Sequence, residues 1–215
     1  PRDKGAPAEE AQRQRWFALL AAAALHYHRR LLKSPYADRA RVYLTRRGLS
    51  AEVIARFQLG YALPEWEEAK RALTGEGYDL ADLEAVGLVS RHEDGQTTYD
   101  RFRGRLMIPI RDGQGRVVGF GARALEEGQQ PKYLNSPQTA LFDKGRLLFG
   151  LDMAKQAIRA ADLAVIVEGY MDVLAAHQHG QHNVVASMGT ALTENQLRQL
   201  TRYTHKIVLA LDADE

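Results

Sequence analysis

The chain has 215 residues, 45% of them hydrophobic, and a net charge of +2 at pH 7, which is typical of a globular protein with one domain or two small ones. It contains no cysteine, which excludes a disulfide framework and a cysteine-ligated zinc site and fits the reducing cytoplasm. The apolar stretch at 18–25 is far shorter than the roughly 20 residues of a membrane span, so we expect neither a membrane segment nor a signal peptide.

The first third of the chain is predicted to be helical. Residues 8–33 show helical periodicity, with Trp16, Leu20 and Tyr27 near one face. Gly48 ends the second helix, and Ser50 caps the third. The further helices are expected at 37–47, 51–57, 65–74 and 79–86.

Two β-hairpins are predicted after these helices. An Asp94-Gly95 turn marks the first, and Asp112-Gly-Gln-Gly115 connects the apolar strands 105–111 and 116–121 of the second. Gly119 and Gly121 lie in that last strand, where we expect them to let another element approach the backbone. The stretch that begins at Gly128 is expected to be an irregular connection.

The last part of the chain follows a βαβαβ pattern, with apolar strands at 163–167, 183–187 and 207–211. Such a unit predicts a parallel sheet with ligands at the carboxyl ends of its strands. We therefore expect an α+β amino-terminal basic subdomain at 1–158 and a Rossmann-like α/β subdomain at 159–215. Because an acidic cluster at a strand end is the last feature of the sequence, we expect this subdomain to be incomplete at its carboxyl end.

Carboxylates follow two of these strands. Glu168 ends the first, while Asp212 and Asp214, two residues apart and on one side, end the last. If the two strands are neighbours, the three carboxylates lie together, as a Mg²⁺ site for phosphoryl transfer requires. Asp172 follows in the first turn of a helix, where a purely structural role at the helix start is the alternative.

Positive charge is concentrated in two segments, 1–50 and 101–160, which alternate with two acidic segments. A polyanion would bind the basic segments, although solvated arginines on helices would give the same composition. Arg101, Arg103 and Arg105 are expected to alternate along a strand and share one face. Tyr133 and Asn135 are candidates for nucleotide contacts, with ordinary core packing as the alternative for the tyrosine.

Several motifs resemble the bacterial DnaG-type primase core with its toprim domain. The toprim resemblance rests on Glu168-Gly-Tyr-Met-Asp-Val, Ala186-Ser-Met-Gly-Thr-Ala-Leu-Thr193 and Leu211-Asp-Ala-Asp214. Upstream motifs of the same core correspond to 99–112, 119–123, 131–137 and 142–146. The resemblance covers about residue 36 to the end and implies an RNA polymerase that copies single-stranded DNA into short RNA primers from NTPs.

The resemblance implies roles for individual residues. Glu168, Asp212 and Asp214 correspond to catalytic, metal-binding positions, with Asp172 a further metal ligand and Mg²⁺ or Mn²⁺ the cofactor. Ala213 replaces the glycine that the family often has between the two aspartates, and a further acidic motif of the family would follow Glu215.

Basic positions of the template and nucleotide path align with Arg47, Arg123 and Lys132, and Lys144 and Arg146 are expected to extend the same groove. Arginine forks and lysine ammonium groups both suit phosphates, and the binding that they provide falls with salt.

The family also predicts partners and domains outside this sequence. A separate zinc-binding domain precedes the core, and a carboxyl-terminal domain contacts the replicative helicase; a single-stranded DNA-binding protein is a further partner. We expect such a protein in the cytoplasm, at the replication fork in the nucleoid, with no membrane association. Two alternatives stay open: a non-catalytic single-stranded DNA-binding fragment, and another toprim enzyme such as a nuclease or topoisomerase, although no nucleophilic tyrosine motif is evident.

Overall fold

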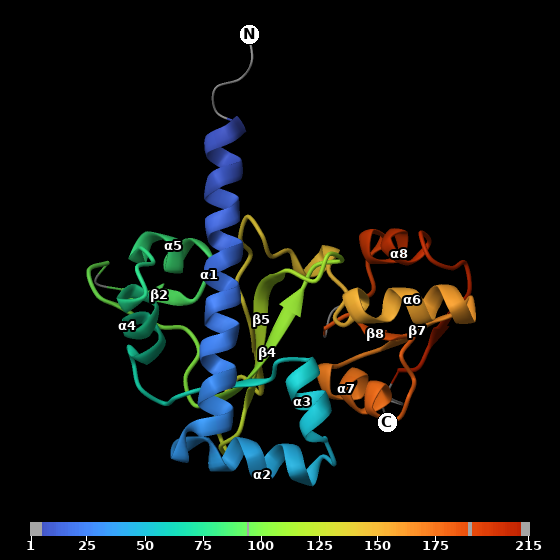
Figure 1. The fold of residues 1–215 in the computed structure, drawn as a ribbon, viewed down its shortest axis with the longest axis horizontal. Coiled ribbons are helices and arrows are strands. Elements are labelled where there is room, and N and C mark those ends of the chain that lie inside the picture. The colour runs from blue at the N-terminus through green and yellow to red at the C-terminus, as the bar shows by residue number, and fades with distance from the viewer. Residues whose placement is uncertain (1–5, 94, 189–190, 212–215) are drawn as a thin grey trace.

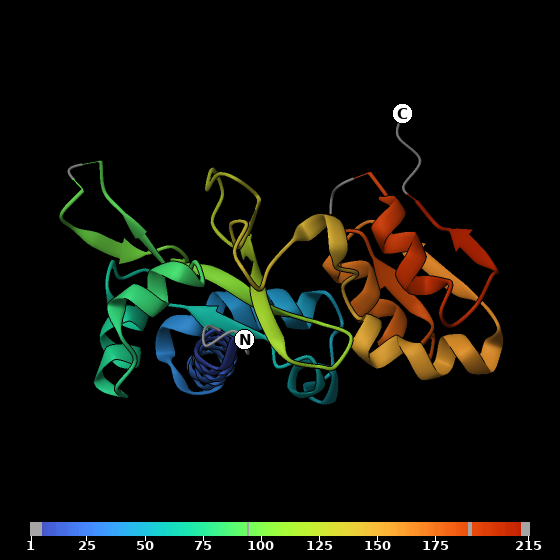
Figure 2. The same ribbon diagram turned by 90° about the horizontal axis from the view of Figure 1, so that it is seen from above.

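The computed structural model describes residues 6–93, 95–188 and 191–211, which fold into two lobes (Figures 1 and 2). Helix α1 (Ala6–Lys33) is the longest element and runs across the first lobe. Leu20, Ala23 and Tyr27 of this helix are buried at helical spacing, which confirms the predicted amphipathic helix. The other helices of the first lobe are η1 (Pro35–Ala37), α2 (Asp38–Arg46), α3 (Ala51–Arg56), α4 (Glu68–Gly75) and α5 (Leu80–Ala85).

The predicted short helices are confirmed, with one shifted start. Ser50 caps α3 as expected, because its hydroxyl accepts a hydrogen bond from the Val53 amide at 3.3 Å. Helix α4 begins three residues later than the predicted 65–74. The carboxylate of Asp100 sets this start by accepting hydrogen bonds from the amides of Ala69 (2.7 Å) and Lys70 (2.9 Å).

The first lobe contains a four-stranded antiparallel sheet in the order β1-β4-β5-β6 and a separate β2–β3 hairpin. Both predicted hairpins are confirmed as strand pairs, although Asp94 of the turn predicted for the first lies outside the described residues. The strands are β1 (Gly60–Ala62), β2 (Val89–Arg91), β3 (Thr98–Asp100), β4 (Arg105–Arg111), β5 (Val117–Ala124) and β6 (Tyr133–Asn135).

The expectation of an irregular connection after Gly128 is wrong in part, because this stretch includes strand β6. Tyr133 pairs with Arg123 of β5, and Asn135 pairs with Gly121. Three residues are too few to show an alternating pattern, so the strand exists only through its pairing with β5.

The expectation that Arg101, Arg103 and Arg105 share a strand face is also wrong. Only Arg105 belongs to a strand, and Gly104, at φ 60°, turns the chain just before it. The Arg105 side chain is buried and donates hydrogen bonds to the carbonyl oxygens of Pro131 (2.7 Å) and Gln130 (3.1 Å). Its role is to hold the loop between β5 and β6.

The second lobe has the predicted parallel βαβαβ unit. Its sheet has the order β8-β7-β9, so β7 lies in the centre and both neighbours run parallel to it. Helices α6 and α8 cover one face and α7 covers the other (Figure 1). The elements are α6 (Leu151–Ala161), β7 (Ala164–Val167), α7 (Tyr170–Gln178), β8 (Val184–Ala186), α8 (Glu194–Leu200) and β9 (Ile207–Leu209), with η2 (Lys144–Arg146) in the connection between the lobes.

A shared apolar core joins the lobes. Val173 and Leu174 of α7 belong to the same buried cluster as Leu106 and Ile108 of β4. The boundary at residue 158 stays a prediction; helix α6 runs through it and packs on the second sheet. None of the helices formed by the described residues is long and apolar enough to cross a membrane.

Gly121 confirms the expected close approach of another element. A Cβ atom at this position would lie 2.5 Å from Cζ of Tyr170, which comes from α7 of the second lobe. Gly119 is in a similar position, since its Cβ would lie 2.6 Å from Cδ2 of Phe142. Both distances are far below van der Waals contact, so only glycine fits at either position without movement of its neighbour.

Candidate active site

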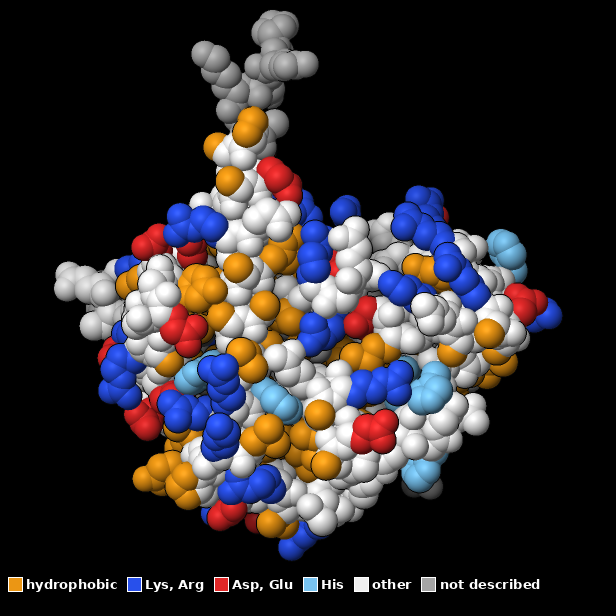
Figure 3. Space-filling view, viewed as in Figure 1, with side chains coloured by type: hydrophobic (Ala, Val, Ile, Leu, Met, Phe, Trp, Pro, Cys, Tyr) orange, Lys and Arg blue, Asp and Glu red, His pale blue; other side chains and the backbone are white. Residues whose placement is uncertain are grey.

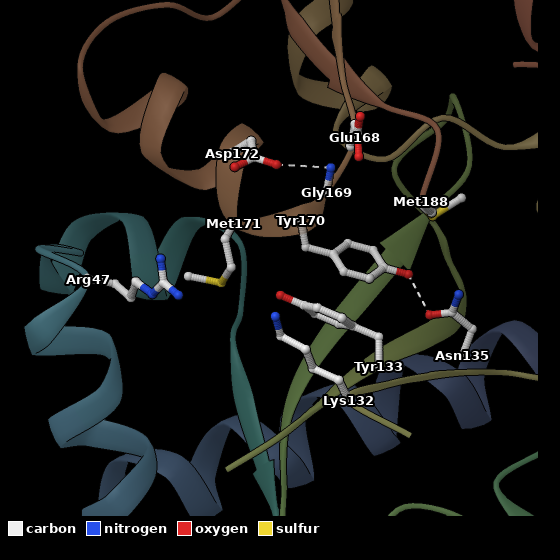
Figure 4. A pocket seen from close by; sticks show the side chains of 10 residues that line it. All are labelled: Arg47, Lys132, Tyr133, Asn135, Glu168, Gly169, Tyr170, Met171, Asp172 and Met188. Carbon is white, nitrogen blue, oxygen red and sulfur yellow. Dashed lines mark hydrogen bonds between the residues drawn. The ribbon is translucent and has the colours of Figure 1, made fainter. Parts of the chain in front are cut away.

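A cavity of about 360 Å³ lies where the two lobes meet (Figure 4). Its walls come from the end of α2, from β6 with the residue before it, and from the loop and first turn that link β7 to α7. The lining residues are Arg47, Lys132, Tyr133, Asn135, Glu168, Gly169, Tyr170, Met171, Asp172 and Met188. Four of the predicted site residues, two cations and two carboxylates, therefore share one space.

The acidic side of the cavity is formed by Glu168 and Asp172. Glu168 directly follows β7, and Asp172 lies in the first turn of α7. One carboxylate oxygen of Asp172 accepts a hydrogen bond from the Gly169 amide at 3.0 Å, so the structural role considered for this residue is present. The same side chain also lines the cavity, so the helix start and the cavity share this carboxylate.

The strand that leads to the Asp212 and Asp214 motif runs beside Glu168. Strand β9 pairs with β7 in parallel, and the Ala210 amide donates a hydrogen bond to the carbonyl oxygen of Ile166 at 2.9 Å. The condition that the two strands are neighbours is met. Asp212 and Asp214 themselves lie outside the described residues.

The chemistry of the carboxylates fits a divalent cation. Mg²⁺ and Mn²⁺ prefer oxygen ligands, and Mg²⁺ typically uses one or two carboxylates together with substrate phosphates. Glu168 and Asp172 supply such oxygens from one side of the cavity. Within the described part of the chain, no three acidic, histidine or cysteine side chains group into a metal site.

The basic side of the cavity is formed by Arg47 and Lys132. In Figure 4 the ammonium group of Lys132 points into the space beneath Met171 and Tyr170, and Arg47 approaches from the end of α2. Both residues are exposed to solvent, so their cationic groups are accessible to an anionic ligand. On the face shown in Figure 3, by contrast, lysines and arginines are spread over both lobes and form no single patch.

Arg123 contacts the ring of Tyr43, a ring that also contacts Arg47. The guanidinium carbon of Arg123 lies 4.0 Å from the ring centroid of Tyr43, and the guanidinium carbon of Arg47 lies 5.4 Å from the same centroid. Burial raises the pKa of the Tyr133 phenol, and the nearby guanidinium of Arg123 opposes this shift. Arg123 is thus not a lining residue of the cavity, but it interacts with Tyr133, which is one.

Tyr133 and Asn135 have different roles in the structure. Tyr133 is 37% exposed and lines the cavity, so it is not ordinary core filling. The Oδ1 atom of Asn135 accepts a hydrogen bond from the Tyr170 hydroxyl at 2.6 Å, which joins the two lobes at the base of the cavity.

Lys144 and Arg146 lie outside this cavity. They belong to η2, and Arg146 forms an ion pair with Asp143 at 3.3 Å. The Lys144 carbonyl oxygen accepts a hydrogen bond from Gln196 of α8, and burial lowers the pKa of the Lys144 amine. Their contribution to a nucleic-acid groove stays a prediction.

Several residues of the site, Tyr170 among them, were not singled out from the sequence. Met171 and Met188 line the cavity, and Tyr43 lies between two of the predicted arginines. A signal for Tyr43 exists, because it precedes Arg47 by four residues and so shares a helix face with it. For the two methionines only the motifs around them provide a hint.

Comparison with protein families assigns both lobes. A model described as the N-terminal domain of the DNA primase catalytic core matches residues 26–155. A toprim-like model matches residues 165–215.

Similar full-length proteins are bacterial DNA primases. The DNA primase of Synechococcus elongatus is 50% identical over 208 residues, which cover 95% of this chain and 30% of the relative. The DNA primase of Escherichia coli K12 is 43% identical over 206 residues, 96% of this chain and 35% of the relative. The chain therefore spans about a third of the length of these curated relatives.

Solved structures show the same fold. The RNA polymerase domain of Mycobacterium tuberculosis primase DnaG superposes with a TM-score of 0.88 at 39% identity, over 94% of this chain and 68% of that one. A DnaG primase catalytic domain bound to single-stranded DNA has a TM-score of 0.84 at 42% identity, over 93% of this chain and 64% of that one.

Proposed function

This chain belongs to the DnaG-type DNA primase catalytic core family, and we propose that the cavity between its lobes takes part in RNA primer synthesis on a single-stranded DNA template. One observation carries the proposal: Lys132 and Arg47 line the same cavity as Glu168 and Asp172. Groups suited to phosphates and groups suited to a divalent cation thus share one space, as nucleotidyl transfer requires.

In this reaction the 3′ hydroxyl of the growing RNA attacks the α-phosphorus of an incoming NTP. A new bond forms between the 3′ oxygen and the α-phosphorus. The bond between the α-phosphorus and the oxygen that bridges the α- and β-phosphates breaks, and pyrophosphate leaves. Lys132 and Arg47 bind and orient phosphate groups, and Tyr133 offers a ring against which a base can stack. Glu168 is the candidate base for the proton of the attacking hydroxyl.

Glu168 and Asp172, with Asp212 and Asp214, which follow β9 in the sequence, would hold Mg²⁺ or Mn²⁺. When bound, the cation would stabilise the negative charge that develops on the transferred phosphoryl group. Arg123, Lys144 and Arg146 extend the basic path for template and nucleotide. We place the functional division between 1–158, which supplies the cations, and 159–215, which supplies the carboxylates.

The parent protein would act in the cytoplasm, at the replication fork. The family resemblance adds a zinc-binding domain, the replicative helicase and a single-stranded DNA-binding protein to its surroundings. These partners are tested on the full-length protein by co-purification with each isolated component.

A primer-synthesis assay tests the proposed activity. This chain and a version that continues beyond Glu215 through the downstream acidic motif are incubated with single-stranded DNA, labelled NTPs and Mg²⁺ or Mn²⁺. We expect short RNA from the longer version. Glu168→Gln in that version should abolish the RNA while DNA binding persists, whereas Glu194→Gln, an exposed change in the same lobe, should leave it unchanged.

Two other results would contradict the proposal. Salt-sensitive DNA binding without RNA from the longer version would support a non-catalytic single-stranded DNA-binding module. Cleavage of labelled DNA without joining of NTPs would support a toprim nuclease.

A further inference from the structure

The link between α2 and α3 brings a cation to the catalytic cavity. Arg47 directly follows α2, and its side chain lines the cavity. In Figure 4 this side chain extends from the end of α2 toward Met171 of α7. Whatever fixes the backbone at this helix end therefore also fixes the direction from which the Arg47 guanidinium enters the cavity.

Helix α2 ends in a Schellman motif. The Gly48 amide donates a hydrogen bond to the carbonyl oxygen of Thr45 at 2.9 Å, and the Leu49 amide donates to that of Leu44 at 3.1 Å. Gly48 has a φ of 69°, which this motif requires and which glycine adopts at little cost. Both bonds use the amide groups of the link, so the carbonyl oxygen of Gly48 is open to a partner from elsewhere in the chain.

That partner is Gln178, the last residue of α7. Its side-chain Nε2 donates a hydrogen bond to the carbonyl oxygen of Gly48, and its Oε1 accepts one from the Ser50 amide at 2.7 Å. A single side-chain amide of the second lobe thus holds the backbone on both sides of Leu49. The first turn of the same helix carries Asp172, so α7 contacts the link at one end and the cavity at the other.

The surrounding packing holds Gln178 itself in place. The ring of His177, the preceding residue, is buried and lies edge-on to the ring of Phe57 at the end of α3, with 5.3 Å between the centroids. Leu49 is 7% exposed and belongs to the same buried cluster as Leu174 of α7. Because close-packed side chains leave little room for movement, Gln178 is presented to the link from a fixed backbone.

We propose that Gln178 is a positioning residue for the cavity, whose two hydrogen bonds hold the end of α2 so that Arg47 faces the carboxylate side formed by Glu168 and Asp172. Gln178 lies outside the cavity and has no charge, so it would act through Arg47 and not on a ligand. A cation on a fixed backbone loses less freedom when it binds a phosphate group. The inference rests on the proposed function, because it assumes that Arg47 binds phosphate.

The salt dependence of DNA binding tests this role. Gln178→Met keeps the length of the side chain and its lack of charge but removes both hydrogen bonds. It should weaken binding of a 5′-labelled dT oligomer of about 16 nucleotides, measured by anisotropy, by about 2-fold to 10-fold. The slope of log affinity against log salt should fall toward that of Arg47→Ala, although the substitution removes no cation. Gln181→Met, an exposed change three residues later, is the matched control and should alter neither quantity.

A double-mutant cycle separates positioning from a general loss of structure. In the Arg47→Ala background, Gln178→Met should weaken binding little further, because the group that Gln178 positions is already absent. A purely structural role would instead weaken binding by the same factor in both backgrounds, and that result would overturn the proposal.

A second variant tests the Gly48 bond alone. Gln178→Glu can still accept a hydrogen bond from the Ser50 amide but has no donor for the Gly48 carbonyl oxygen. Gln181→Glu adds the same charge three residues away. We expect Gln178→Glu to bind the oligomer more weakly than Gln181→Glu does, and equal affinities would overturn the proposal. This comparison remains decisive if the circular dichroism spectrum shows that Gln178→Met does not fold.

The outcomes for Arg47 and Gln178 identify which idea is wrong. Unchanged affinity and slope in folded Gln178→Met, while Arg47→Ala still weakens binding, would overturn the positioning role and leave the proposed function standing. If Arg47→Ala bound the oligomer like the wild type, Arg47 would have no part in phosphate binding, and the cationic side of the proposed site would fail together with this inference.

Discussion

The hydroxyl group of Tyr170 donates a hydrogen bond to Oδ1 of Asn135 at 2.6 Å and thereby joins α7 of the second lobe to β6 of the first. The phenol is buried, and this burial raises its pKa above the ordinary value. Tyr170 follows Glu168 by two residues, and Asn135 follows Lys132 by three. This contact therefore fixes the carboxylate side of the cavity relative to its cationic side.

The first prediction concerns the glycine on which Tyr170 packs. Gly121→Ala should lower the free energy of unfolding by about 1–3 kcal/mol, because the new methyl group would overlap the Tyr170 ring and force the lobes apart. Gly113→Ala is the matched control, since it lies in the turn of the same hairpin and its Cβ meets nothing within 4 Å. Urea denaturation measures both; equal stability of the two variants would contradict the packing described.

The second prediction isolates the hydrogen bond. Tyr170→Phe keeps the ring on Gly121 and removes only the hydroxyl, so we expect a loss of about 1 kcal/mol in the free energy of unfolding. Tyr36→Phe, at a side chain that is 70% exposed, should have no measurable effect. A thermal melt followed by circular dichroism compares the pair, and an unchanged Tyr170→Phe variant would show that the bond adds nothing to lobe docking.

The third prediction concerns the cations of the cavity. Lys132→Ala should weaken binding of single-stranded DNA and reduce the slope of log affinity against log salt by about 1, because one phosphate contact is lost. Arg47→Ala should behave alike. Arg71→Ala is the control, since Arg71 is exposed, pairs with Glu65 at 3.0 Å and lies outside the cavity. Anisotropy titrations at several salt concentrations provide the slopes. An identical slope for Lys132→Ala and Arg71→Ala would show that DNA does not bind along the cavity.

The fourth prediction is a dependence of stability on pH that originates at Asp100. Burial raises the pKa of this carboxyl from 3.8 to about 6, against the opposing effect of its hydrogen bonds from the Lys70 and Ala69 amides. The contribution of Asp100 to the free energy of unfolding is complete below pH 3.8. It is lost as the pH rises through about 6, because the buried carboxyl group must then ionise. The difference between the two pKa values corresponds to about 3 kcal/mol.

Asp100→Asn, which cannot ionise, separates this effect from all other titrations. Between pH 4 and pH 7 the free energy of unfolding of the wild type should fall relative to that of the variant. Urea denaturation across this range measures the difference, and parallel curves for the two proteins would refute it.

The local pattern of the sequence determined most of the secondary structure. The helical periodicity in 8–33 and the short apolar run in 105–111, which a turn follows, are properties of neighbouring residues, so the helix and the strand were predictable. The same holds for Glu168 at a strand end, because a βαβαβ unit allows little choice in the direction of its strands. Several motifs in one order also identified the family, which the comparisons confirmed.

Only the tertiary structure decided which residues meet. Arg47 and Glu168 line one cavity although more than a hundred positions separate them, and Tyr170 finds Asn135 because Gly121 leaves room for its ring. Likewise, Arg105 is buried against a loop, whereas the sequence pattern had predicted a strand face shared with Arg101 and Arg103. The physical reason is that such contacts depend on how the two sheets pack through a shared core, and this packing leaves no periodic trace in either segment.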